Sequence, residues 1–217
     1  NAAFTATGGG TVSATQNNTS IVNTLTTTTA TALNVANTTI GASGLTFRSI
    51  TSNGSGSANG IILNTTGATG GLTVTGNGGP CTSAGTCTGG TISNKTGADG
   101  TGNGIGIYAN STSNVSITRM KLNDFSNYAV RGTTVTGFTM NNCFIDGVNG
   151  DNAATDEGTI IFDGLTGTSS FFSDTIKGGF EDNFRIRNSS GTANNITIDS
   201  CTIRDTSTGV SGNDNLI

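Results

Sequence analysis

The side chains best suited to chemistry in this sequence are carboxylates, and several of them gather in one segment. The stretch DGVNGDNAATDEG contains Asp146, Asp151, Asp156 and Glu157. Carboxylate oxygens are hard ligands that Ca²⁺ prefers, so these four residues are the candidate calcium ligands. Their spacing matches neither an EF-hand nor the glycine-rich calcium nonapeptide, and a solvated acidic loop is the competing interpretation. We therefore assign no metal site and no cofactor.

Catalytic arrangements are hard to build from this composition. The 217 residues include no histidine, which leaves no imidazole base and no Ser-His pair. Glycoside hydrolysis needs two carboxyl groups about 5 to 9.5 Å apart, whereas Asp124 and Asp205 share a predicted column in which they lie about 14 Å apart. Asp146 is expected to face Lys177 in a surface ion pair. No catalytic residue is predicted.

The four cysteines bear on the cellular compartment. Cys81 and Cys87 lie in GGPCTSAGTCTGG, where glycine and proline leave the chain free to turn, and a disulfide between them is predicted. A disulfide indicates an oxidising exterior, while a metal clip or two unpaired thiols are the alternatives. Cys143 and Cys201 share an inward column about 10 Å apart, which is too far to bridge, and are predicted to be buried apolar residues.

An internal repeat must position these residues. Apolar residues alternate at spacing two, change phase once at a polar pair such as Thr118 and Arg119, and then alternate again, which predicts short strands with a bend between them. The three clearest copies are Val115, Ile117, Met120 and Leu122; Phe138, Met140, Cys143 and Ile145; and Ile196, Ile198, Cys201 and Ile203. A repeat of about 22 to 30 residues is typical of a solenoid coil. The sequence therefore predicts an all-β protein in which copies of each strand stack in parallel.

The repeat varies in clarity along the chain. Residues 1–44 are predicted to form irregular N-terminal coils, with short strands at Val12, Ile21 and Leu33, and the threonines at 26–29 form either a strand or a linker. Residues 45–217 are predicted to form regular coils with insertions at 76–90 and 149–157. In the copy that begins at Ser169, Asp174 replaces an inward apolar residue.

Two further sets of positions follow from this alignment. Asparagine tolerates left-handed backbone, and stacked amides can bond along a solenoid axis. A structural column of asparagines is predicted at the corner that precedes one strand of each coil: Asn59, Asn103, Asn127, Asn183 and Asn213. The corner before Thr159 lacks an asparagine and has Glu157 instead.

Outward positions carry a row of hydroxyls. These residues are Thr46, Thr73, Ser116, Thr139, Ser170 and Thr197. The next outward column is mixed, so an ice-binding face is not predicted, and β-propensity explains the hydroxyls. The spacing of two between Arg185 and Arg187 places both on the outer face of a strand. With 10% charged residues and a net charge of −4, the chain offers no basic face for nucleic acid, and it has no apolar run long enough for a membrane span.

The segments LTFRSI, LTVTGNGG, NVSITRMKL, FTMNNCFIDG and NITIDSCTIRD, together with the recurring corner asparagine, resemble right-handed parallel β-helix proteins of the pectin-lyase-like type. The sequence is most similar to the Thr/Asn/Gly-rich solenoids of large bacterial surface and secreted proteins. The resemblance implies a β-solenoid, but such solenoids include adhesins, autotransporter stalks, enzymes and phage tailspikes.

The resemblance leads us to expect a non-enzymatic extracellular or cell-surface β-helix that serves as a stalk, adhesin segment or filament subunit. Its expected partners are further coils of the same polypeptide or head-to-tail copies of itself, because neither terminus resembles a cap. Surface glycans and a host or neighbouring cell surface are further candidates. The alternative is a carbohydrate-active lyase or hydrolase whose catalytic coils lie partly outside these residues.

Overall fold

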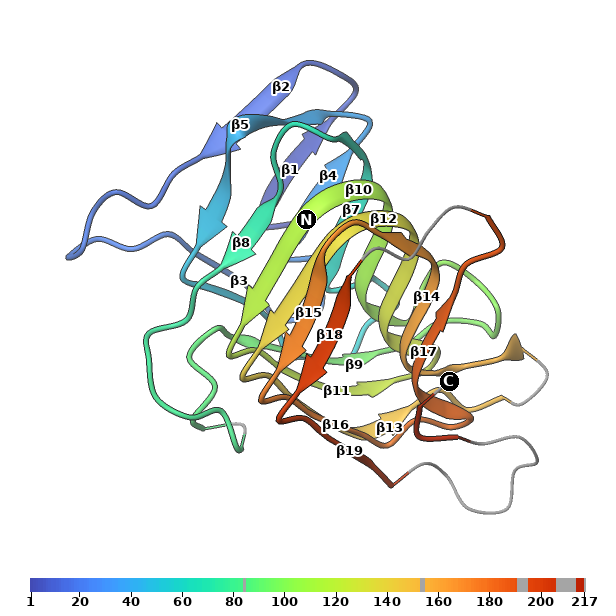
Figure 1. The fold of residues 1–217 in the computed structure, drawn as a ribbon. Helices are drawn as coiled ribbons and strands as arrows, with labels where there is room; N and C mark the ends of the chain where they lie inside the picture. Colours follow the sequence, from blue (N-terminus) through green and yellow to red (C-terminus); the bar gives the residue numbers. More distant parts are fainter. Residues whose placement is uncertain (84, 153–154, 191–194, 206–213, 217) are drawn as a thin grey trace.

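The computed structural model describes residues 1–83, 85–152, 155–190, 195–205 and 214–216 (Figure 1). Strands are the regular elements of these ranges, in which no α-helix occurs. All strand pairings in the described part are parallel. The prediction of an all-β protein with parallel sheets is therefore confirmed.

The strands form three rows, and each row stacks successive turns of the chain. The first row is β1 (Phe4–Thr7), β4 (Leu33–Ala36), β7 (Ile61–Gly67), β10 (Ile105–Thr118), β12 (Tyr128–Asn141), β14 (Gly158–Thr166) and β17 (Asp182–Arg187). The second row is β2 (Thr11–Ala14), β5 (Thr39–Phe47), β8 (Leu72–Val74), the later parts of β10 and β12, β15 (Ser169–Phe172) and β18 (Ile196–Asp199). The third row is β3 (Thr24–Thr27), β6 (Ser49–Ser52), β9 (Thr91–Lys95), β11 (Lys121–Phe125), β13 (Phe144–Asn149), β16 (Thr175–Lys177) and β19 (Thr202–Arg204).

The first two rows belong to one twelve-stranded sheet, and the third row is a seven-stranded sheet. Figure 1 shows the rows running through the body of the molecule, with loops projecting from the places where the chain turns. This arrangement is consistent with a β-solenoid. The predicted division at residue 45 stays a prediction.

The register of the rows is the one that the repeat predicts. In the second row, Ile117 pairs with Met140, Met140 with Phe171, and Phe171 with Ile198. In the third row, the paired residues are Leu122, Ile145, Ile176 and Ile203. Most of these side chains are fully buried, but Ile198 is 37% exposed, because β18 has a paired neighbour on one side only within the described residues.

The change of phase within each repeat has a backbone cause. The residue after the second-row strand takes a positive φ in four successive turns: Arg119 (55°), Asn142 (52°), Ser173 (54°) and Ser200 (58°). One residue in the left-handed region turns the chain sharply, and the next residue then points inward. The bend predicted at Thr118 and Arg119 is therefore confirmed.

Aromatic rings fill the centre of the later turns. Phe138 lies edge-on to Phe162, with ring centroids 5.0 Å apart, and Phe171 lies edge-on to Phe184 at 4.6 Å. Gly132 pairs with Phe162 on the neighbouring strand, and a Cβ at Gly132 would overlap the Phe162 ring. The missing side chain at Gly132 thus leaves room for the Phe162 ring of the neighbouring turn, and the rings pack edge to face.

The N-terminal residues join the same rows. Phe4 pairs with Leu33, and the threonine run contributes to β3, which pairs with β6. A strand therefore replaces the linker interpretation of that run. The strand predicted at Ile21 is wrong, because Ile21 is 76% exposed in a loop whose backbone hydrogen-bonds to the Asn18 side chain. Local side-chain bonds of this kind compete with strand pairing.

Asp174 occupies the inward position that the repeat assigns to it. The residue is buried, and its carboxylate accepts a hydrogen bond from the backbone N–H of Cys143 at 2.7 Å. Burial raises the pKa of Asp174 to about 7. A carboxyl group among apolar residues is more stable without its charge. The stability of the fold therefore depends on whether Asp174 is protonated.

We expect Met140→Asp to prevent folding, because an unpaired charge would be buried between neighbouring turns at a cost of more than about 4 kcal/mol. Thr139→Asp is the matched control, since Thr139 is adjacent but only partly buried. Urea unfolding followed by circular dichroism should show a transition for the control only. A stable Met140→Asp protein would contradict the assigned register.

We also expect Asp174 to make stability depend on pH. Because the folded-state pKa is raised from 3.8 to about 7, its stabilising contribution is complete below pH 3.8 and is lost as the pH rises through 7. Asp174→Asn should therefore match the wild type near pH 4.5 and exceed its unfolding free energy at pH 8 by about 3 kcal/mol. Urea midpoints at the two pH values measure this, and equal differences at both would contradict it.

Candidate binding site

The outer face of the first row holds a group of three charged residues, Arg131, Asp163 and Arg187. Thr133, Asp163 and Arg187 are level with one another on β12, β14 and β17. The Arg131 guanidinium contacts the Asp163 carboxylate, and Arg187 Nε donates to the same carboxylate at 3.0 Å. Since outward residues recur every second position, parallel pairing alone brings together residues that are far apart in sequence.

A depression of about 570 Å³ adjoins this group. Its lining is rich in hydroxyls and consists of Thr133, Thr134, Asp163, Gly164, Thr166, Arg187, Ser189 and Ser190. Burial by itself would raise the pKa of Asp163, but hydrogen bonds and charges from Arg131 and Arg187 outweigh it, so the pKa lies below its usual value. The carboxylate is thus ionised, and the three residues carry a net positive charge in an acidic chain.

This arrangement is suited to binding rather than to proton transfer. The Arg187 side chain is 63% exposed, so its remaining guanidinium donors can reach a ligand. Hydroxyls, a carboxylate and a guanidinium together offer donors and acceptors to a polyhydroxylated molecule such as a saccharide. The sequence predicted that Arg185 and Arg187 lie on the outer face, which is confirmed, but it did not connect Arg187 with Asp163.

Hydrogen bonds to Glu157 and Thr155 hold the acidic loop in place. Glu157 is fully buried, and its carboxylate accepts hydrogen bonds from the backbone of Gly100, Asp151 and Asn152 and from the Thr155 hydroxyl. Together with the hydrogen bond from Tyr128 Oη to the Thr155 carbonyl at 3.2 Å, these bonds hold the loop beside the outer face of the first row.

The four candidate calcium ligands do not come together. Asp146 contacts Lys121, Asp156 contacts Arg185, and Glu157 is committed to loop N–H groups. Within the described ranges, no group of three or more side chains is arranged to hold a metal ion. Three of the four carboxylates therefore already have protein partners, and calcium binding by this segment is not assigned.

The residues of the predicted asparagine column differ in their hydrogen-bond partners. Asn59, Asn127 and Asn183 are buried. The amides of Asn59 and Asn127 donate to backbone carbonyls of loops, including Gly102 at 2.6 Å from Asn59. The Asn183 amide donates to the Arg204 carbonyl of β19 at 2.7 Å and to the Asn215 side-chain oxygen at 2.9 Å. Asn103 is exposed and supplies only its backbone carbonyl, which accepts from Asn127 at 2.6 Å. Asn213 lies outside the described residues. Asn59 and Asn127 thus fasten loops to corners, whereas the Asn183 amide bonds to the side chain of another asparagine, Asn215.

The register explains why. Tyr128 pairs with Gly158, and Gly158 with Asp182, so the residue level with Asn127 is Glu157, which directly precedes β14. Asn183 is instead level with Thr159, whose hydroxyl donates to the Asn183 side-chain oxygen at 3.0 Å. Glu157 therefore takes the corner position of Asn127.

The predicted row of outward hydroxyl residues is present, because its members pair with one another on neighbouring strands. Its successive pairs are Thr46 with Thr73, Thr73 with Ser116, Ser116 with Thr139, Thr139 with Ser170, and Ser170 with Thr197. The neighbouring column stays mixed, since Thr118 is followed by Asn141, Phe172 and Asp199. The row is compatible with cross-strand hydroxyl contacts.

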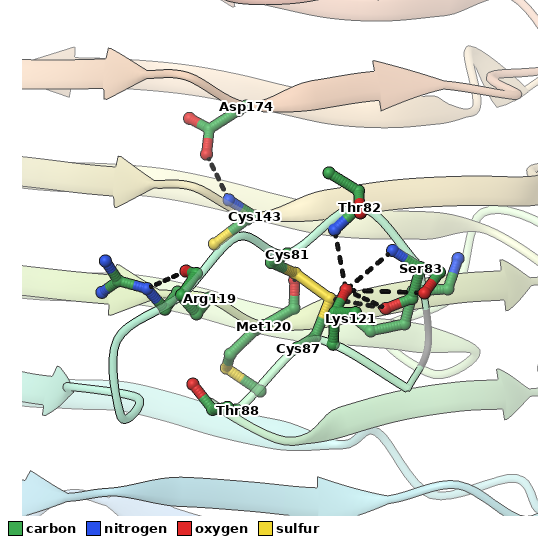
Figure 2. The surroundings of a disulfide bond; sticks show 12 residues. Cys81, Thr82, Ser83, Cys87, Thr88, Arg119, Met120, Lys121, Cys143 and Asp174 are labelled. Carbon is green, nitrogen blue, oxygen red and sulfur yellow. Dashed lines mark hydrogen bonds between the residues drawn. A yellow bond between two sulfur atoms is a disulfide. The ribbon is translucent and has the colours of Figure 1, made fainter.

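Cys81 and Cys87 form the predicted disulfide, with Cα atoms 4.3 Å apart (Figure 2). Arg119 Nε donates to the Gly79 carbonyl at 2.7 Å, so the bend residue of one turn holds the loop. Cys143 and Cys201 are not bonded to each other. Figure 2 shows the Cys143 backbone N–H bonded to Asp174 on the next turn.

Comparisons with protein-family models, with curated proteins and with solved structures give no match for this chain. The described part contains no helix that is long and apolar enough to cross a membrane.

We expect Glu157→Gln to lower the melting temperature, because an amide can accept at only one atom and would leave loop N–H groups unpaired, at about 1–3 kcal/mol. Limited proteolysis should then cut near residues 149–157. Glu181→Gln is the control. Neither Ca²⁺ nor EDTA should move the wild-type melting temperature, and a clear rise with Ca²⁺ would restore the calcium interpretation.

Proposed function

We propose that the chain is a right-handed parallel β-helix that acts outside the cell as a non-enzymatic structural or adhesive element. The observation that carries this proposal is the in-register parallel pairing of three rows through the described chain. Each turn then bonds to the turns beside it, and such a stack resists bending. Parallel crossovers are right-handed in nearly all proteins, and the disulfide suits an oxidising exterior.

The adhesive contact in this proposal is the depression beside Asp163 and Arg187. Its hydroxyl-rich lining and exposed guanidinium suit a glycan, which binds through many polar contacts on a preformed surface. The partners at the two ends of the stack are further coils or head-to-tail copies. The exposed inward-column residue Ile198 on β18 is one feature that such a partner would cover.

A glycan array tests the adhesive role. The wild-type chain should bind hydroxyl-rich glycans, and Arg187→Gln should weaken binding at least about tenfold, since a charge-assisted hydrogen bond contributes about 1.5–3 kcal/mol. Arg48→Gln removes the same charge from the bend between β5 and β6 and should leave binding unchanged. Equal binding by both variants, or no binding at all, would reject the depression as the contact. Release of new reducing ends from a bound polysaccharide would contradict a non-enzymatic role.

A further inference from the structure

Lys121 and Asp146 meet across two strands of the third row. Lys121 on β11 is level with Phe144 on β13, and Asn123 is level with Asp146. The Lys121 side chain is 5% exposed, its Nζ contacts the Asp146 carboxylate, and the nitrogen lies 4.5 Å from the centre of the Phe144 ring. The sequence predicted that Asp146 lies opposite Lys177, which the register bears out, but the Asp146 carboxylate contacts Lys121 instead.

The surroundings of Lys121 stabilise an ordinary ion pair poorly. An ammonium group offers three N–H donors, yet the described residues provide no hydrogen-bond acceptor for the buried Lys121 nitrogen beyond its contact with this carboxylate. Burying a charge without full solvation is costly. Burial also lowers the pKa of Lys121 to about 8, although the nearby Asp124 charge opposes this. An appreciable fraction of the amine is therefore uncharged and nucleophilic at neutral pH.

A second carboxylate lies beside the pair. Asp124 Oδ1 accepts a hydrogen bond from the Val148 N–H at 3.1 Å. A Cβ at Gly147 would clash with the Asp124 carboxylate, and Gly147 also has a φ of +76°. Glycine therefore allows Asp124 to pack against the backbone that follows Asp146. The site combines an amine, a carboxyl group and a potential proton carrier, all fixed on paired strands.

We propose that Lys121 and Asp146 are joined by an intramolecular amide bond that forms spontaneously after folding. Lys121 Nζ attacks Cγ of the protonated Asp146 carboxyl, so that an N–C bond forms and a C–O bond breaks. Asp124 takes a proton from Nζ and returns it to the departing oxygen, which leaves as water. The ammonium and carboxylate thus become one amide and one water, with no change in oxidation state. Proximity on paired strands supplies the effective concentration for this condensation.

Intact mass spectrometry of the full chain tests the proposal. The wild type should be lighter than its disulfide-bonded sequence by one water, and tryptic digestion should yield a branched peptide that joins Lys121 to Asp146. An Asp-Gly sequence can also lose water by closing a succinimide within its own backbone. Hydroxylamine cleaves a succinimide and leaves a side-chain amide intact, so it separates these products. A full-mass wild type, or a hydroxylamine-sensitive one without the branched peptide, would overturn the proposal.

Matched variants assign the roles. Lys121→Arg should restore the mass of the missing water, while Lys177→Arg should retain the cross-link, since Lys177 lies on the other side of Asp146. Asp124→Asn should fold, because asparagine tolerates the positive φ at this position (62°), but should accumulate uncrosslinked chain. Circular dichroism confirms that each variant is folded. A cross-link that survives Lys121→Arg would reject Lys121 as the nucleophile.

Discussion

The parallel register between successive turns is the constraint on which the structure depends. A slip of one residue would turn an inward column such as Ile117, Met140 and Phe171 toward solvent, and a strand with that exposure could not stack. The left-handed residue that follows β10, β12, β15 and β18 preserves this register around the bend. Packing and backbone geometry thus enforce the same alignment, and the outward residues acquire their neighbours as a result.

Several polar groups in the interior are tolerated because they meet a defined backbone partner. Asn127 and Glu157 occupy equivalent corner positions in adjacent turns, one as a donor and the other as an acceptor toward loop backbone. Asp174 is the less complete case: one of its oxygens accepts the Cys143 N–H, and the other is buried without a described partner. Backbone hydrogen bonds thus fix the loops at these corners, whereas the incompletely bonded Asp174 makes the stability of its turn depend on pH.

The sequence carried the fold further than the sites. The second-row and third-row columns could be read from Val115 to Ile203 because nearly all inward residues there are apolar, with Asp174 as an exception. The first row was misaligned, since placing Asn183 opposite Asn127 shifts β17 by two residues relative to its real partners. With that shift, Arg187 no longer falls opposite Asp163, and the binding site disappears. Asparagine suits any corner where an amide is needed. Its recurrence therefore predicts corners, but it does not show which residues are level on neighbouring strands.

The disulfide loop leaves the stack and returns to it at one place. A Cβ at Gly76 would lie 3.1 Å from Cβ of Arg119, and Gly89 donates its N–H to the Arg119 carbonyl at 2.8 Å. The segment between Gly76 and Gly89 is thus an insertion at a bend. The neighbouring turns make the same bend with only a few residues. Bends of this kind are the natural points at which the protein can vary in length. A foreign peptide grafted at the Asn142 bend, with its own cysteine clasp, would be displayed outward while the strands on either side keep their partners.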